Sequence, residues 1–102
     1  IIMDAFDLPI KTLVLSSPLA EDLVADPKQD YIFDASKIAI DAAFISAYVA
    51  FLGTIDSEAH SRVLVAQNET LSLFPETLVV VPTLGEAKDV IDMERIERDL
   101  GI

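Results

Sequence analysis

The chain contains no cysteine, and this absence removes several kinds of chemistry together. Disulfides, thiolate metal sites and cysteine nucleophiles are all excluded. Histidine is almost absent too, because His60 is the only one. A Ser-His-Asp triad would have to recruit that residue from a predicted loop, and the G-x-S-x-G motif of serine hydrolases is missing. No assembled catalytic set is therefore visible, and no motif calls for a cofactor.

Basic residues are also scarce. The 102 residues include 7 Lys and Arg against 18 Asp and Glu, which gives a formal net charge of −11. The basic residues are scattered along the chain and form no run. Phosphate backbones and anionic membrane surfaces attract clustered Lys and Arg. We therefore expect no direct nucleic-acid binding and no membrane binding.

The N-terminus lacks the features of a secretory signal. Ile1-Ile2-Met3-Asp4 offers neither a basic stretch nor a long apolar stretch, so the cytoplasm is the expected compartment. Repeats, low-complexity tracts and long linkers are missing as well, which predicts a single α/β domain over residues 1–102. Because the first residue is not Met, a fragment without its native N-terminus is also considered.

Apolar residues, in contrast, are abundant. They make up 52% of the chain, and a chain this short has little interior in which to bury them. An apolar surface that the fold itself does not cover is a common mark of association. A second copy of the same chain is the simplest partner, so we expect a homo-oligomer.

Strand and helix signals alternate along the sequence. Apolar, β-branched runs predict strands at 10–15, 31–33 and 77–81, and a hairpin of two further strands at 62–67 and 70–74. Helices are predicted at 18–25, at 34–52, and from Thr83 to Leu100 with a break near Asp92. These elements together predict an α/β sandwich with a mixed sheet of four to five strands and about three helices.

The segment 34–52 gives the strongest helix signal. It contains no Pro or Gly, begins with a capping residue in Asp34, and is followed by Gly53. Such an apolar helix is expected to be central and covered on nearly every side. Small residues line one side, which either packs inside the fold or meets the same helix of a second subunit; the predicted interface residues are Ala39, Ala43, Ser46 and Ala50.

Two strand-to-helix turns are candidates for an anion site. The first is Ser16-Ser17-Pro18, and the second spans 82–86 and begins with Pro82-Thr83. If their strands were parallel neighbours, both helix N-termini would open at one edge of the sheet and could bind a phosphate or carboxylate. The alternative is that these residues only cap helices, since Thr83 and Glu86 match the capping box. Neither turn is rich in glycine.

Carboxylates provide a third type of candidate site. Asp30, Asp34 and Asp41 lie close in sequence, and clustered carboxylates bind Mg²⁺ for phosphodiester cleavage. Asp34 lies at the end of a short predicted strand, and the six residues from Tyr31 to Ser36 resemble the segment that carries the first acidic residue of PIN-type nucleases. No further carboxylate pattern completes the resemblance. Asp56, Glu58 and His60 have spacing that suits a metal. A solvated or capping role is the alternative for every one of these residues.

The leading hypothesis is a non-catalytic α/β module that self-associates or serves as a subunit of a complex. A small-anion-binding protein or enzyme that uses Ser16, Ser17 and Thr83 is the first alternative. An Mg²⁺-dependent nuclease or phosphodiesterase that acts at Asp30, Asp34 and Asp41 is the second. Apart from this hypothesis, the candidate metal ligands are Asp34, Asp41 and His60.

Overall fold

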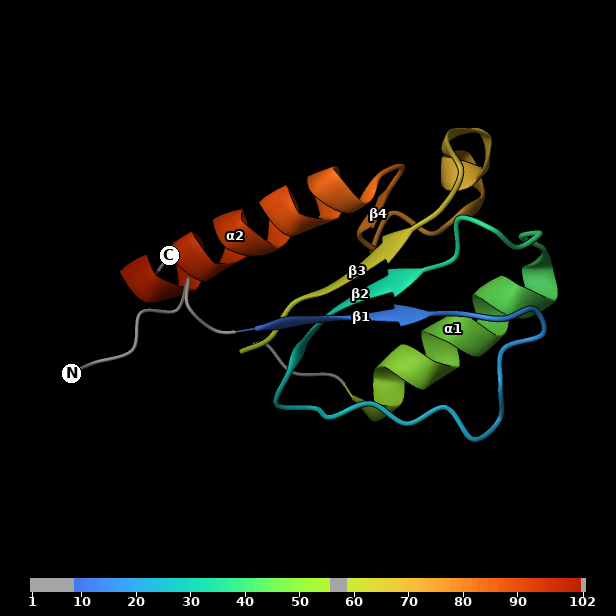
Figure 1. Cartoon of the computed structure of the whole chain (residues 1–102), viewed down its shortest axis with the longest axis horizontal. Coiled ribbons are helices and arrows are strands. Elements are labelled where there is room, and N and C mark those ends of the chain that lie inside the picture. Colours follow the sequence, from blue (N-terminus) through green and yellow to red (C-terminus); the bar gives the residue numbers. More distant parts are fainter. Residues whose placement is uncertain (1–8, 56–58, 102) are drawn as a thin grey trace.

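The structure is a computed structural model that describes residues 9–55 and 59–101. Its centre is a four-stranded sheet in the order β1-β2-β3-β4, with every strand parallel to its neighbour (Figure 1). The strands are β1 (Ile10–Val14), β2 (Asp30–Asp34), β3 (Arg62–Val65) and β4 (Val80–Val81). The two inner strands, β2 and β3, are the most deeply buried, as expected for strands that are covered on both faces.

One face of the sheet is covered by the three connections between the strands. These are the irregular segment 15–29, the helix α1 (Ala42–Thr54) and the 3-10 helix η2 (Asn68–Leu73) with its flanking turns. Aromatic rings fill this core: Phe33 of β2 packs edge-on against both Tyr48 and Phe51 of α1. Connections between neighbouring parallel strands run right-handed, so a strand order that always advances in one direction places all three on the same face.

The opposite face is covered by α2 (Leu84–Leu100). Thr83 begins this helix, because its side chain accepts a hydrogen bond from the Glu86 N–H at 3.1 Å. Gly101 ends it with a positive φ of 72°, a conformation that glycine adopts without strain. Ala87 and Ile91 of α2 pack on Ile32 of β2 and on β3. Helices thus lie on both sides of the sheet (Figure 1).

The predicted α/β class is confirmed, whereas the mixed sheet and the hairpin are wrong. Residues 70–74 lie in and just after η2 and do not pair with β3. The position beside β3 is taken by β4, through hydrogen bonds from Leu64 N–H to Val79 O (3.0 Å) and from Ala66 N–H to Val81 O (3.0 Å). Two apolar residues of the predicted second hairpin strand, Leu71 and Phe74, instead pack into the core, whereas Leu73 is exposed.

The prediction of a long central helix over 34–52 is also wrong. Asp34 ends β2, and its carbonyl accepts a hydrogen bond from Leu15 N–H at 2.8 Å. The Asp34 carboxylate then accepts from the N–H (2.9 Å) and hydroxyl (2.6 Å) of Ser36, a local turn that competes with helix formation. The helix begins only at Ala42, where Asp41 is the N-cap and accepts from Phe44 N–H at 2.8 Å.

Two further helix predictions need correction. Residues 18–25 are irregular apart from a turn at 21–22, and Leu19, Leu23 and Ala25 pack into the core without a regular helix. Short isolated helices gain little stability of their own, so packing decides the local conformation. The predicted break near Asp92 does not occur, because α2 runs through it. The apolar residues before and after Asp92 occupy different sides of one continuous helix.

Candidate functional site

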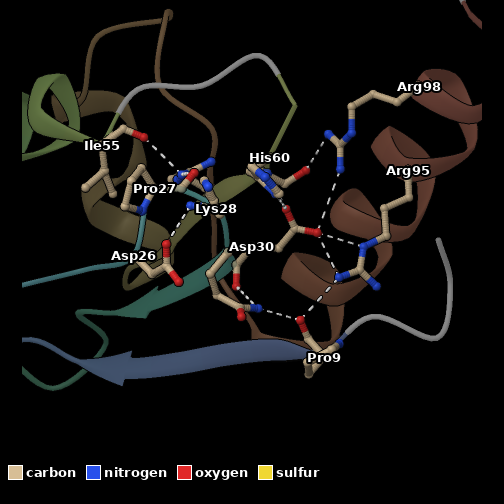
Figure 2. Close-up of polar contacts among 12 residues, drawn as sticks. Pro9, Asp26, Pro27, Lys28, Asp30, Ile55, His60, Arg95 and Arg98 are labelled. Carbon is tan, nitrogen blue, oxygen red and sulfur yellow. Dashed lines mark hydrogen bonds and ion pairs between the residues drawn. The ribbon is translucent and has the colours of Figure 1, made fainter. Parts of the chain in front are cut away.

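The most densely connected polar cluster surrounds Asp30, the first residue of β2 (Figure 2). Its carboxylate accepts hydrogen bonds from Ser61 N–H at 2.7 Å and from Arg95 Nε at 2.8 Å. Arg95 Nη2 lies 2.7 Å from Asp30 Oδ2, and Arg98 Nη2 lies 3.7 Å from the same oxygen. His60 Nδ1 is 3.4 Å from Oδ1. Asp30 and Arg95 are both almost wholly buried, at 3% and 2% exposed.

The topology explains why these residues meet. All four strands begin at one edge of the sheet, and α2 runs back across the sheet so that its last turns return to this amino edge. Two further hydrogen bonds close this edge, one to the main chain and one between side chains. Arg95 Nη2 donates to Pro9 O at 3.4 Å, and Arg98 Nη1 donates to Ser61 Oγ at 3.0 Å. The Asp30 carboxylate and Arg95 together therefore join the starts of β1, β2 and β3 to the end of α2.

The electrostatics of this cluster keep Asp30 ionised. Burial alone would raise its pKa, but the hydrogen bonds from Ser61 and Arg95 and the charges of Arg95 and Arg98 outweigh it. The net result is a pKa lowered from the ordinary value of 3.8. A carboxylate whose oxygens are already engaged by strong donors is a poor general base. The arrangement therefore acts as a buried ion-pair clasp that fixes α2 to the sheet.

The predicted anion-site residues are not brought together. Ser16 and Ser17 follow β1, and Thr83 follows β4, so they lie at the two opposite ends of the strand order. Neighbouring strands are about 4.8 Å apart, which separates the two turns by roughly 14 Å across the sheet. Ser16 Oγ donates to Pro18 O at 3.0 Å, and Thr83 caps α2. The capping interpretation is confirmed for Thr83.

The candidate carboxylates do not gather either. Asp30 and Asp34 occupy the two ends of β2, which four residue steps of about 3.3 Å separate by roughly 13 Å. Asp41 caps α1, and His60 contacts Asp30. Asp56 and Glu58 fall outside the described residues. Within the described part of the chain, no three His, Cys, Asp or Glu side chains are grouped closely enough to hold a metal ion.

A groove of about 410 Å³ lies between α2 and the outer strand β1. Apolar side chains form much of its wall, together with Lys88, Asp92 and Arg95. Arg95 directs its guanidinium at Asp30, as Figure 2 shows, so the buried cation of this groove already has its counter-ion. The groove is therefore not a built anion site.

The outer side of α1 is the most unusual surface. The four predicted interface residues are all exposed; they are Ala39, just before the helix, and Ala43, Ser46 and Ala50 within it. Val49 shares this side and is 43% exposed. The sequence of α1 contains no charged residue at all, whereas a helix that faces water normally carries charges on its outer side.

Two hollows run beside this surface, where the segment 17–23 lies along α1. The larger has a volume of about 390 Å³, and its apolar walls include Leu19, Leu23 and Phe51. The smaller, of about 180 Å³, lies between Pro18 and Ala43. The exposed side of α1 is thus continuous with hollowed, mainly apolar surface. A surface with such hollows can accept side chains from another molecule.

Comparison with protein-family models, with curated proteins and with solved structures finds no match. Among the described residues, no helix is long and apolar enough to cross a membrane. The fold is that of a small α/β protein with a parallel sheet.

Sequence reasoning missed the Asp30–Arg95 pair. A signal for it was present, because Ala87, Ile91 and Arg95 follow one another at intervals of four and so share one side of α2. A cation in line with core residues indicates a buried partner of opposite charge. No local pattern identifies the partner as Asp30, because it lies 65 residues away in the sequence.

Proposed function

We propose that this protein is a non-catalytic α/β module that self-associates through the outer side of α1. One observation carries the proposal: a helix of 13 residues with no charged side chain presents one whole side to solvent. Isolated exposed apolar residues are normal, but an entire uncharged helix side with adjoining apolar hollows is typical of an interface.

The chemistry of this surface favours a second copy as the partner. Two chains that each carry a net charge of −11 repel each other, and α1 itself contains no charged residue, so they can meet there with little opposing charge. Asp41 and Glu21 are the acidic residues that line the adjoining hollows. Ala43, Ser46 and Ala50 are small enough to let two helices approach closely. A two-fold axis through this side would pair α1 with α1 and bury both copies of Val49.

Sedimentation equilibrium of the wild-type chain against two variants tests the proposal. Ala50→Glu introduces a charge at the proposed contact, and Leu73→Glu introduces the same charge on η2, at an exposed leucine outside it. We expect a dimer for the wild type and for Leu73→Glu, and a monomer for Ala50→Glu. Circular dichroism verifies that all three are folded.

Two outcomes would overturn the proposal. One is a wild-type chain that stays monomeric at high micromolar concentration. The other is an Ala50→Glu variant that dimerises as strongly as the wild type, which would place any self-association on another surface.

A further inference from the structure

The helix α2 has a second apolar side that points away from the sheet. Met93, Ile96 and Leu100 are spaced by three and four residues and so lie on one side of the helix. They are 63%, 42% and 65% exposed. At about 100° per residue this side is opposite the one that carries Ala87 and Ile91, which are fully buried against the sheet. We call these three residues the outer stripe of α2.

The spacing of the outer stripe is that of a helix that docks with another molecule. Positions i, i+3 and i+7 are the anchors by which amphipathic helices bind apolar grooves or other helices. Only the inner side of α2 is needed for the fold, because it forms the core with β2 and β3. The outer stripe therefore has no role in the packing that the structure shows.

The charges around the outer stripe have one sign. Asp89, Glu97 and Asp99 flank it and are all exposed. The cations in this half of the helix face the other way: Arg95 is buried against Asp30, and Arg98 reaches the same carboxylate and Ser61 (Figure 2). The clasp at Asp30 thus draws Arg95 and Arg98 inward and leaves an apolar strip with an acidic rim, while Lys88 stays exposed in the first half of α2.

We propose that the outer stripe binds a basic amphipathic segment of another protein, an apolar helix side flanked by Lys and Arg. Complementary charge at the rim favours such a segment and selects against acidic ones. A second copy does not fit, because it would place Asp89, Glu97 and Asp99 against further acidic residues of its own α2. The stripe and α1 lie on opposite sides of the sheet, so this site is independent of the proposed dimer contact.

The binding test uses two synthetic helical peptides with the same leucine pattern, one with lysine and the other with glutamate at every polar position. Isothermal titration calorimetry measures affinity, and amide chemical shifts of the labelled protein locate the contact. The triple variant Met93→Gln/Ile96→Gln/Leu100→Gln removes the stripe, and Leu73→Gln is a matched control at an exposed leucine on η2. Denaturation curves verify that the variants keep wild-type stability.

We expect the lysine peptide to bind the wild type and Leu73→Gln equally, with shifts in the second half of α2. The triple variant should lose at least about tenfold in affinity, the scale set by the removal of interface anchors. The glutamate peptide should not bind.

Equal binding of the lysine peptide to the triple variant would overturn the proposal, because the attraction would then be general to an acidic protein. Equal binding of the glutamate peptide would overturn it as well, by removing the role of the rim. A change in sedimentation of the triple variant would show that the stripe contacts a second copy, whereas loss of dimerisation in Ala50→Glu alone concerns only α1.

Discussion

Asp30 and Arg95 are buried against each other at the amino edge of the sheet, with Arg95 Nε 2.8 Å from Asp30 Oδ2. One lies at the start of β2 and the other in the penultimate turn of α2. Loss of one partner leaves the other charge buried without its counter-ion. Substitution of one member of a buried ion pair is therefore expected to destabilise the fold strongly.

Asp30→Asn should therefore lower the free energy of unfolding by about 3–5 kcal/mol, because the buried guanidinium of Arg95 loses its counter-ion. Urea denaturation followed by circular dichroism measures the change. Asp22→Asn is the matched control: Asp22 is exposed, and its substitution should change stability by less than about 0.5 kcal/mol. Equal effects of the two substitutions would show that the clasp adds nothing beyond an ordinary surface charge.

The clasp also predicts a pH dependence. The pKa of Asp30 is lowered on folding, so the ionised carboxylate contributes stability above its ordinary value of 3.8. That contribution should fall as the pH drops below this value toward the folded pKa, as the carboxylate becomes protonated. Denaturation at a series of acidic pH values should show the difference between wild type and Asp30→Asn shrinking in this range. A difference that stays constant with pH would contradict the assignment.

The N-cap of α2 offers a local test. Thr83→Ala removes the oxygen that accepts from Glu86 N–H and should cost about 1 kcal/mol of stability. Thr77→Ala is the matched control, at an exposed threonine in the turn before β4. A fall in the thermal midpoint for Thr83→Ala alone supports the cap, and equal midpoints for the two variants argue against it.

The aromatic core around β2 gives a prediction about packing. Phe33 is fully buried, with ring centroids 5.2 Å from Tyr31, 5.8 Å from Tyr48 and 5.6 Å from Phe51. Phe33→Leu should lower the free energy of unfolding by about 1–3 kcal/mol, through lost ring contacts and a small cavity. Leu73→Ala, at an exposed leucine, should change it far less. Similar losses in both variants would show that the ring cluster is not a tightly packed core.

Local patterns predicted the elements whose own residues decide their structure. The apolar runs at β1 and β2, the cap at Thr83 and the stop at Gly101 all follow from near neighbours along the chain. The errors arise where distant contacts decide. Asp34 is a good helix cap in isolation, yet sheet pairing with Leu15 holds it in β2. Residues 70–74 have strand character, yet β4 occupies the place beside β3.

The candidate sites also divide into features set by near neighbours in the sequence and features set by distant contacts. Thr83 was predicted as a cap from four residues of sequence, and the structure confirms it. The exposure of Ala43, Ser46 and Ala50 depends on where α1 lies against the sheet, which the alanine pattern alone does not determine. The partner of Arg95 depends on the path of α2 across the sheet, a property of the whole topology.

Because the strands are all parallel, their amino ends lie along one edge of the sheet and their carboxyl ends along the other, and the two edges carry different features. The clasp that secures α2 is confined to the edge where the strands begin, while the turns that follow β1, β2, β3 and β4 emerge at the other. We expect insertions or substitutions in the turns after β1, β2 and β3 to leave the buried charges undisturbed, whereas the turn after β4 holds Thr83, the N-cap of α2. A chain built in this way can vary in the first three of these turns without loosening the ion pair that holds α2 at the other end of the sheet.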